Sequence, residues 1–270
     1  MKFGSYENFK TIINWRQAVP TAVTIAAMLA GFLSILSTIQ GMVNEEPHMF
    51  SLAARLIMLA MILDGLDGNL ARWLRGSSEF GAELDTYVDM TAFGIAPAVL
   101  IFAVTMQGRD PLWRVLLPSA VALSGVVRLA RFKVKDPLRG QGGYAGLPIT
   151  ANAGWVSLFV FVTQTWYKDR SNLSEGPVAL IFLAGILVFI VLQVTNLRYP
   201  KPTKKAAIFI PCVILVGLFC FLRRDYAAYI AIFMLIMGLV YAFIGPMFVK
   251  GMAIHKARKE AREANNNDDQ

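Results

Sequence analysis

Charged side chains are scarce in this chain: they make up 16% of its 270 residues, against about a quarter in an ordinary soluble domain. Hydrophobic residues make up 56%, and the mean hydropathy is +0.52. This composition excludes a disordered chain, which combines few apolar residues with many charges. It also excludes an ordinary cytosolic enzyme, and it is typical of a protein that crosses a membrane several times.

Cysteine and histidine are also rare, with two residues of each. Cys212 and Cys220 fall within one apolar run, which excludes a disulfide scaffold and a cysteine-bound metal. We expect His48 in an outward loop and His255 in the C-terminal segment, so neither lies near the acidic motif described below. Covalent catalysis through a histidine is therefore not expected.

Long runs of apolar residues are the most prominent feature of the sequence. A bilayer core about 30 Å thick needs about 20 apolar helical residues for each crossing, and short basic or Gly- and Pro-bearing stretches separate the runs. We therefore expect an all-α polytopic membrane protein with about eight transmembrane helices. The predicted spans are residues 19–41, 50–71, 84–105, 112–130, 147–166, 177–196, 206–222 and 226–249.

The two ends of the chain differ from its middle. In residues 1–18, aromatic and aliphatic residues recur at about helical spacing among basic ones, which predicts a cytoplasmic interfacial helix. Residues 19–250 form a single transmembrane domain, because the connections between spans are too short for a separate soluble domain. Residues 251–270 are polar and are predicted to form a cytoplasmic tail.

Basic residues outnumber acidic ones by 26 to 18, giving a net charge of +8. Most of the lysines and arginines fall at one set of span ends, and the positive-inside rule places those ends and both termini in the cytoplasm. This distribution accounts for the basic balance without a nucleic-acid partner. We expect a bacterial or archaeal plasma membrane as the location, with membrane lipids as neighbours.

Four aspartates stand where the second and third spans meet the cytoplasm. Asp64 and Asp67 are three residues apart, and Asp85 and Asp89 are four apart, so each pair shares one face of a helix. The sequence between the pairs predicts a turn at Gly76 and the two serines after it. Such a turn would bring the second pair back beside the first.

The depth and charge of this motif favour a metal site. Asp64 follows Phe50 by about 21 Å of helical rise, which places the carboxylates in the cytoplasmic leaflet. Four carboxylates there repel one another, and Arg72 is the one cation close in sequence. Oxygen ligands suit hard cations such as Mg²⁺ or Mn²⁺, and paired ions are a common device for phosphoryl transfer. We therefore predict two divalent ions.

The pattern D-x2-D-G-x2-A-R-x8-G-x3-D-x3-D resembles that of the CDP-alcohol phosphatidyltransferase family, and every fixed position matches. The resemblance implies a six-helix catalytic core, usually in a homodimer, with a two-metal site that opens to the cytoplasm. Members of this family of phospholipid-synthesising transferases move a phosphatidyl or related group from a CDP-activated lipid to an alcohol and release CMP.

The resemblance also implies roles for individual residues. Asp64, Asp67 and Asp85 correspond to metal ligands, and Asp89 corresponds to the general base, with a possible ligand role as well. Relatives often begin the first span with Pro-Asn-x-x-Thr, and Thr24 matches the last position of that motif. The residues implied to bind CDP are Thr24, Gly68, Arg72, Ser78 and Gly81.

A second cytoplasmic stretch, Arg-Leu-Ala-Arg-Phe-Lys-Val from residue 128, resembles the phosphatidylserine synthase branch of the family, in which Asn stands at the position of Lys133. It predicts CDP-diacylglycerol as donor and L-serine as acceptor, with Arg128, Arg131 and Lys133 as candidates to bind the serine carboxylate. Other acceptors (glycerol phosphate, inositol phosphate or choline) and an archaeal ether-lipid donor stay open. A cation transporter is the alternative from another class, because carboxylates within a membrane often mark ion paths.

Overall fold

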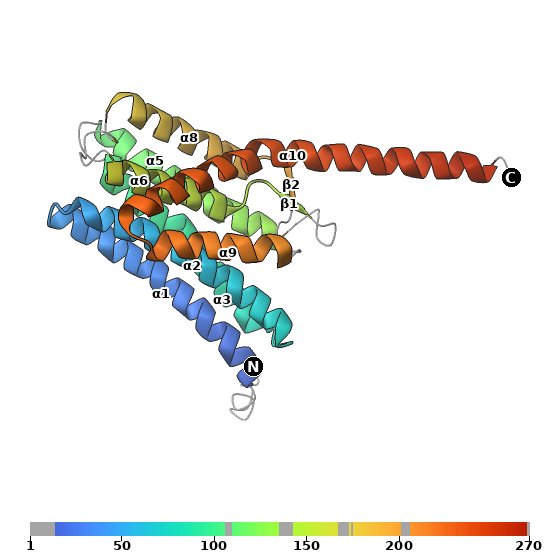
Figure 1. Ribbon diagram of the computed structural model, residues 1–270, viewed down its shortest axis with the longest axis horizontal. Helices are drawn as coiled ribbons and strands as arrows, with labels where there is room; N and C mark the ends of the chain where they lie inside the picture. Colours follow the sequence, from blue (N-terminus) through green and yellow to red (C-terminus); the bar gives the residue numbers. More distant parts are fainter. Residues whose placement is uncertain are drawn as a thin grey trace, which may run out of the picture.

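Helices form nearly all of the computed structural model, which describes residues 14–105, 110–134, 143–166, 173, 175–200 and 206–268 (Figure 1). In chain order the helical segments are α1 (Trp15–Val43), α2 (Pro47–Trp73), α3 (Glu79–Asp89), the π-helical η2 (Met90–Ile95), α4 (Ala96–Thr105), α5 (Pro111–Val134), α6 (Ile149–Trp166), α8 (Gly176–Val194), α9 (Ala206–Phe221) and α10 (Arg224–Asp268).

Each of the eight predicted spans coincides with a helical segment, which confirms an all-α polytopic membrane protein. Within the described part of the chain, six helices are long and apolar enough to cross a membrane. The helices α6 and α9 are not among these six: α9 is shorter, and α6 has most of its residues buried inside the bundle. The number of crossings therefore stays a prediction.

The third predicted span is continuous in space but not uniform in geometry. Its first part, α3, is followed by the wider π-helical turn η2 and then by α4. At η2 the chain lies close to α1, because a Cβ atom added at Gly31 would stand only 2.7 Å from the Cβ of Ala92. Small residues thus let α1 lie against the segment that follows the second pair of aspartates.

The turn between α2 and α3 falls where the sequence predicts it. The helix α2 ends at Trp73, Arg75 adopts a positive φ of 52°, and α3 begins at Glu79. Ser78 is the N-cap of α3, because its side-chain oxygen accepts a hydrogen bond of 3.0 Å from the backbone N–H of Gly81. Serine in this turn therefore fixes where the second acidic helix starts.

The chain ends differ from the predicted boundaries. The interfacial helix predicted for residues 1–18 lies mostly outside the described residues, and Trp15 to Ala18 already belong to α1. At the other end α10 continues past residue 250 to Asp268 as one helix, so the predicted tail is helical over most of its length (Figure 1).

Two short strands, β1 (Gly143–Ala145) and β2 (Arg198–Pro200), pair antiparallel with Tyr144 opposite Tyr199. They join the connection before α6 to the connection after α8, and the Tyr199 hydroxyl donates a 3.1 Å hydrogen bond to the carbonyl of Ala242 in α10. The sequence analysis did not anticipate this pairing, because three-residue strands carry little alternating pattern.

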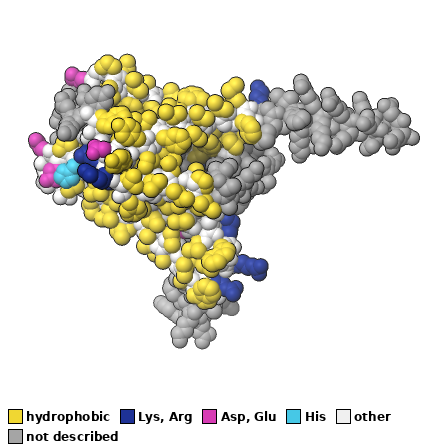
Figure 2. All heavy atoms as spheres, viewed as in Figure 1, with side chains coloured by type: hydrophobic (Ala, Val, Ile, Leu, Met, Phe, Trp, Pro, Cys, Tyr) yellow, Lys and Arg dark blue, Asp and Glu magenta, His cyan; other side chains and the backbone are white. Residues whose placement is uncertain are grey.

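Apolar side chains cover most of the face of the bundle seen in Figure 2, and the charged groups visible there gather toward its two ends. Many large apolar side chains on α1, α5, α8 and α10 are exposed. In water such a surface would be unfavourable, whereas hydrocarbon solvates it, so the distribution fits an integral membrane protein.

Candidate functional site

Three of the four predicted aspartates form a tight cluster between α2 and α3. Asp64 and Asp67 project from α2, Asp85 projects from α3, and one carboxylate oxygen of each lies within 4.8 Å of the others. The three-residue spacing on α2 places both of its carboxylates on the face that meets α3. The predicted return of the second acidic helix is therefore confirmed.

The cluster leaves carboxylate oxygens without partners. Asp67 is buried, and Asp64 Oδ1 and Asp67 Oδ2 are inaccessible to solvent and have no hydrogen-bond partner among the described residues. Buried carboxylate oxygens are costly unless a cation or a donor satisfies them. The set of three converging carboxylates with orphaned oxygens therefore fits a hard divalent cation such as Mg²⁺ or Mn²⁺.

Asp89 lies one helical turn beyond Asp85, at the end of α3 and directly before η2. Its carboxylate interacts electrostatically with Asp85 and with the guanidinium of Arg128 on α5. It is not one of the three residues of the tight cluster. Its place between the cluster and a buried arginine suits a group that takes a proton beside the metal site.

A cavity of about 220 Å³ opens beside the carboxylate cluster, between α1, α2 and α3. Asp67 and Asp85 form part of its wall, and the Thr24 side chain lies against Asp67. Every residue predicted to bind CDP lines this cavity: Thr24, Gly68, Arg72, Ser78 and Gly81. Five positions spread over more than 50 residues of sequence thus meet at one place.

Gly68 faces open space in this cavity. A Cβ atom added there would come no closer than 4.0 Å to any neighbouring atom, the nearest being Nη1 of Arg72. No contact among the described residues therefore requires glycine at this position, and the open space beside it could admit part of a ligand. Ser78, by contrast, already has a structural use as the N-cap of α3.

Arg72 is exposed and held in place by its own helix. Its Nη2 donates a 2.9 Å hydrogen bond to Oδ1 of Asn69, and Asn69 in turn donates a 2.6 Å bond to the carbonyl of Gly65. This chain of contacts orients the guanidinium toward the cavity that Arg72 lines. A planar guanidinium in that position is suited to bind phosphate oxygens.

The cavity also has wall residues that the sequence analysis did not assign. Pro20, Thr21 and Ser77 line it beside the predicted set. The hydroxyl of Thr21 donates a 2.7 Å hydrogen bond to the carbonyl of Gln17, so its oxygen keeps lone pairs for a ligand. The Pro-Thr pair at the start of α1 was the available signal, although threonine there replaces the asparagine of the family motif.

The three basic candidates on α5 differ in their surroundings. Arg128 is only 9% exposed and lies close to Asp89, as a residue at an internal binding site would. Arg131 donates a 2.5 Å hydrogen bond to the carbonyl of Val194 and a further short one to Asn196, so it joins α5 to the end of α8. Lys133 pairs with Glu83 of α3, a partner that the sequence analysis did not anticipate.

Comparison with known proteins finds a matching family model and similar relatives that are named as serine-transferring lipid synthases. The family model for CDP-alcohol phosphatidyltransferases matches residues 17–243. A CDP-diacylglycerol–serine O-phosphatidyltransferase of Helicobacter pylori is 30% identical over 189 residues, covering 70% of this chain and 74% of the relative. One from Saccharomyces cerevisiae is 37% identical over 200 residues, covering 67% and 69%. An archaetidylserine synthase of Methanothermobacter thermautotrophicus is 32% identical over 188 residues, covering 68% and 70%.

Proposed function

Because the chain belongs to the CDP-alcohol phosphatidyltransferase family, we propose that it transfers the phosphatidyl group of CDP-diacylglycerol to the hydroxyl of L-serine. The products are phosphatidylserine and CMP. The observation that carries this proposal is the carboxylate cluster of Asp64, Asp67 and Asp85 beside a cavity lined by Gly68 and Arg72. The relatives named for serine transfer support the choice of acceptor.

The cavity beside the cluster receives the CDP part of the donor. Gly68 leaves room for the nucleotide, and the guanidinium of Arg72 binds an oxygen of the pyrophosphate. Thr24, Ser78 and Gly81 shape the remaining wall. The diacylglycerol part stays in the bilayer, since the site lies at the end of apolar helices.

Asp64, Asp67 and Asp85, with Asp89 beside them, would hold two divalent ions, either Mg²⁺ or Mn²⁺. Such ions would supply positive charge to offset that of the pyrophosphate and of the leaving CMP. Three converging carboxylates from two different helices support this assignment, because without compensating charge they would oppose the packing of α2 against α3.

Asp89 acts as the general base. It accepts the proton of the serine hydroxyl as the serine oxygen forms a bond to the phosphorus of the phosphatidyl group. The bond from that phosphorus to the CMP oxygen breaks, and CMP leaves with the electron pair. The attack is direct: neither histidine of the chain is near the acidic motif in sequence, which supports a path without a covalent intermediate.

Arg128 is the principal group for the acceptor. Its buried guanidinium next to Asp89 can bind the serine carboxylate while the serine hydroxyl faces the base. Arg131 keeps N–H donors beyond those it gives to Val194 and Asn196, and it supplies further positive charge at the same end of α5.

The protein is an integral membrane protein of a prokaryotic plasma membrane, with both termini and the active site in the cytoplasm. The concentration of basic residues at one set of helix ends supports this orientation. The homodimer that the family resemblance implies is part of the same proposal. The membrane lipids surround the protein, and the donor CDP-diacylglycerol reaches the active site from the same membrane.

The test measures CMP release by the purified protein in detergent with CDP-diacylglycerol and Mn²⁺ or Mg²⁺. L-serine, glycerol phosphate, inositol phosphate and choline are added separately, and an Asp89→Asn variant is assayed alongside. We expect release that requires serine and a divalent ion and that is lost in the variant. Release with another acceptor would overturn the choice of serine, and no release with any acceptor from folded protein would overturn the transferase assignment for this chain.

A further inference from the structure

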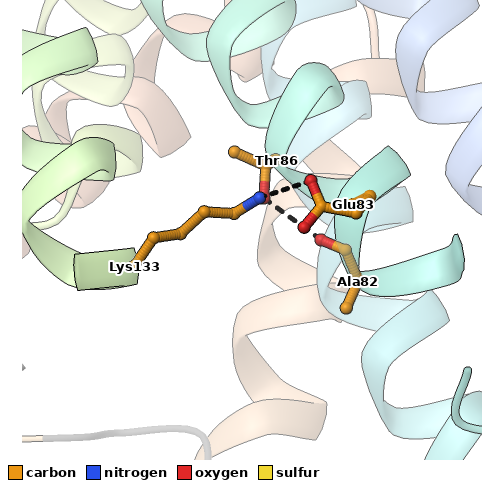
Figure 3. Close-up of polar contacts among 4 residues, drawn as sticks. All are labelled: Ala82, Glu83, Thr86 and Lys133. Carbon is orange, nitrogen blue, oxygen red and sulfur yellow. Dashed lines mark hydrogen bonds and ion pairs between the residues drawn. The ribbon is translucent and has the colours of Figure 1, made fainter. Parts of the chain in front are cut away.

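An ion pair joins two helices on the acceptor side of the proposed site. Lys133, next to last in α5, reaches across to Glu83 of α3, and its Nζ lies 2.6 Å from Oε2 of that carboxylate (Figure 3). On the α3 side, the hydroxyl of Thr86 donates to the carbonyl of Ala82, so the helix is regular where the pair attaches.

On that side, the described residues of α3 also meet α5 electrostatically through Asp89 and Arg128. Of the residues of α3, Val88 is the one that is fully buried, whereas Phe80 and Tyr87 are exposed. The neighbouring α5 packs mainly on η2 and α4. The pair from Lys133 to Glu83 therefore adds a direct link between the exposed side of α3 and the end of α5.

Both residues of the ion pair lie close to residues of the proposed active site. Glu83 precedes Asp85 by two residues, and the Lys133 ammonium is close enough to act electrostatically on Asp85 as well. On the other helix, Lys133 follows Arg128, the proposed acceptor group, by five residues. The ion pair thus bridges the rim between the carboxylate side and the arginine side of the site.

We propose that the Lys133–Glu83 ion pair sets the spacing of α3 and the end of α5 and so positions Asp85 and Arg128 relative to each other. Lys133 is then a positioning residue and does not bind the acceptor directly. This inference rests on the proposed function, because the serine-dependent release of CMP is one of its two readouts.

A positioning role for Lys133 and direct binding of the acceptor by Lys133 predict different effects of single and double substitutions on kcat/KM. A positioning pair loses its effect when either partner is neutralised, so Glu83→Gln and Lys133→Met should each lower kcat/KM for serine by about fivefold. The double variant should lose no more than either single variant. Lys133→Arg should retain most activity, because a guanidinium can still pair with Glu83.

The control is Glu79→Gln, which removes an exposed carboxylate from the same helix at a position outside the pair. We expect it to leave kcat/KM for serine unchanged. If Lys133→Met lowers kcat/KM while Glu83→Gln has no effect, Lys133 contacts the acceptor itself and the proposal is wrong. If neither variant has an effect, the pair is a surface contact only, and the proposal is wrong for that reason.

A second readout does not depend on turnover. Spin labels at Glu79→Cys on α3 and Val134→Cys on α5, in a background that lacks Cys212 and Cys220, report the distance between the helices by pulsed electron resonance. We expect Glu83→Gln and Lys133→Met to broaden the distance distribution. An unchanged distribution would overturn the proposal even where activity falls. If the wild-type protein releases no CMP while the two substitutions still broaden the distance distribution, the proposed function is wrong and the positioning role of the pair stands.

Discussion

The two ends of the helix bundle both place charged side chains within apolar helices, and they satisfy those charges in different ways. Near the turn from α9 to α10, Arg55 donates a 2.8 Å hydrogen bond to the carbonyl of Leu222 and stacks over the ring of Phe161. Arg224 donates to Ser51, to Thr165 and to the carbonyl of Gln164. At this end the protein itself supplies partners to both guanidinium groups, although Nε of Arg55 is buried without one among the described residues.

At the other end the carboxylates are left incomplete. Asp64 and Asp67 each have a buried oxygen without a partner, and they converge with a third carboxylate on the neighbouring helix. Along α2, Arg55 and Asp64 are separated by only about 13 Å of helical rise. The arginine hydrogen bonds join α9 and α10 to the rest of the bundle, whereas the converging carboxylates at the other end suit a bound cation.

The largest expected effect is on the carboxylate end. Asp64→Asn should lower CMP release on the order of 10³-fold, because a metal ligand contributes several kcal/mol to the transition state. In the presence of EDTA its Tm should equal or exceed that of the wild type, since one repelling charge is gone. Activity and Tm are measured on the same preparation. A lower Tm in EDTA would show that Asp64 has a structural role and would remove the contrast between the ends.

The second-largest effect is expected on donor binding in the cavity beside the carboxylates. Gly68→Val should raise KM for CDP-diacylglycerol roughly tenfold without lowering Tm, because its side chain would enter space where no neighbouring atom lies within 4.0 Å of the added Cβ. The matched control is Gly41→Ala at the opposite end, where an added Cβ would lie 2.9 Å from that of Met49. There we expect a lower Tm and an unchanged KM for the folded protein.

A smaller effect is expected at the arginine end. Arg224→Met keeps the length of the side chain but removes its hydrogen bonds to Ser51, Thr165 and the Gln164 carbonyl. The free energy of unfolding should fall by about 2 kcal/mol, while kcat per folded molecule should not change. Denaturation in mixed micelles provides the first quantity. A fall in kcat with unchanged stability would mean that this end takes part in function.

The smallest effect is expected for Arg55→Lys. Lysine keeps the charge but loses the planar guanidinium that bonds Leu222 while it covers the Phe161 ring. We expect a loss of about 1 kcal/mol in the free energy of unfolding, read as a modest drop in Tm. Arg55→Met serves as the comparison and should lose more, because it also leaves the carbonyl of Leu222 without its donor.

Much of the fold could be predicted because membrane helices are marked by continuous apolar runs, and each predicted span contains a helix. The positions of the helix breaks were less accurate. The π-helical turn after Asp89 and the extension of α10 beyond residue 250 have no signal in hydropathy alone. The paired strands β1 and β2 depend on contacts between distant connections, which a local pattern does not contain.

The sequence by itself determined the kind of site, because four aspartates, two glycines and an arginine at fixed spacings define both ligand chemistry and helix faces. The tertiary structure decided which neighbours each basic residue of α5 has. Arg128 is buried next to Asp89, Arg131 joins α8, and Lys133 pairs with Glu83. Spacing on one helix gives the face of a side chain, but its partner on another helix depends on how the two helices pack.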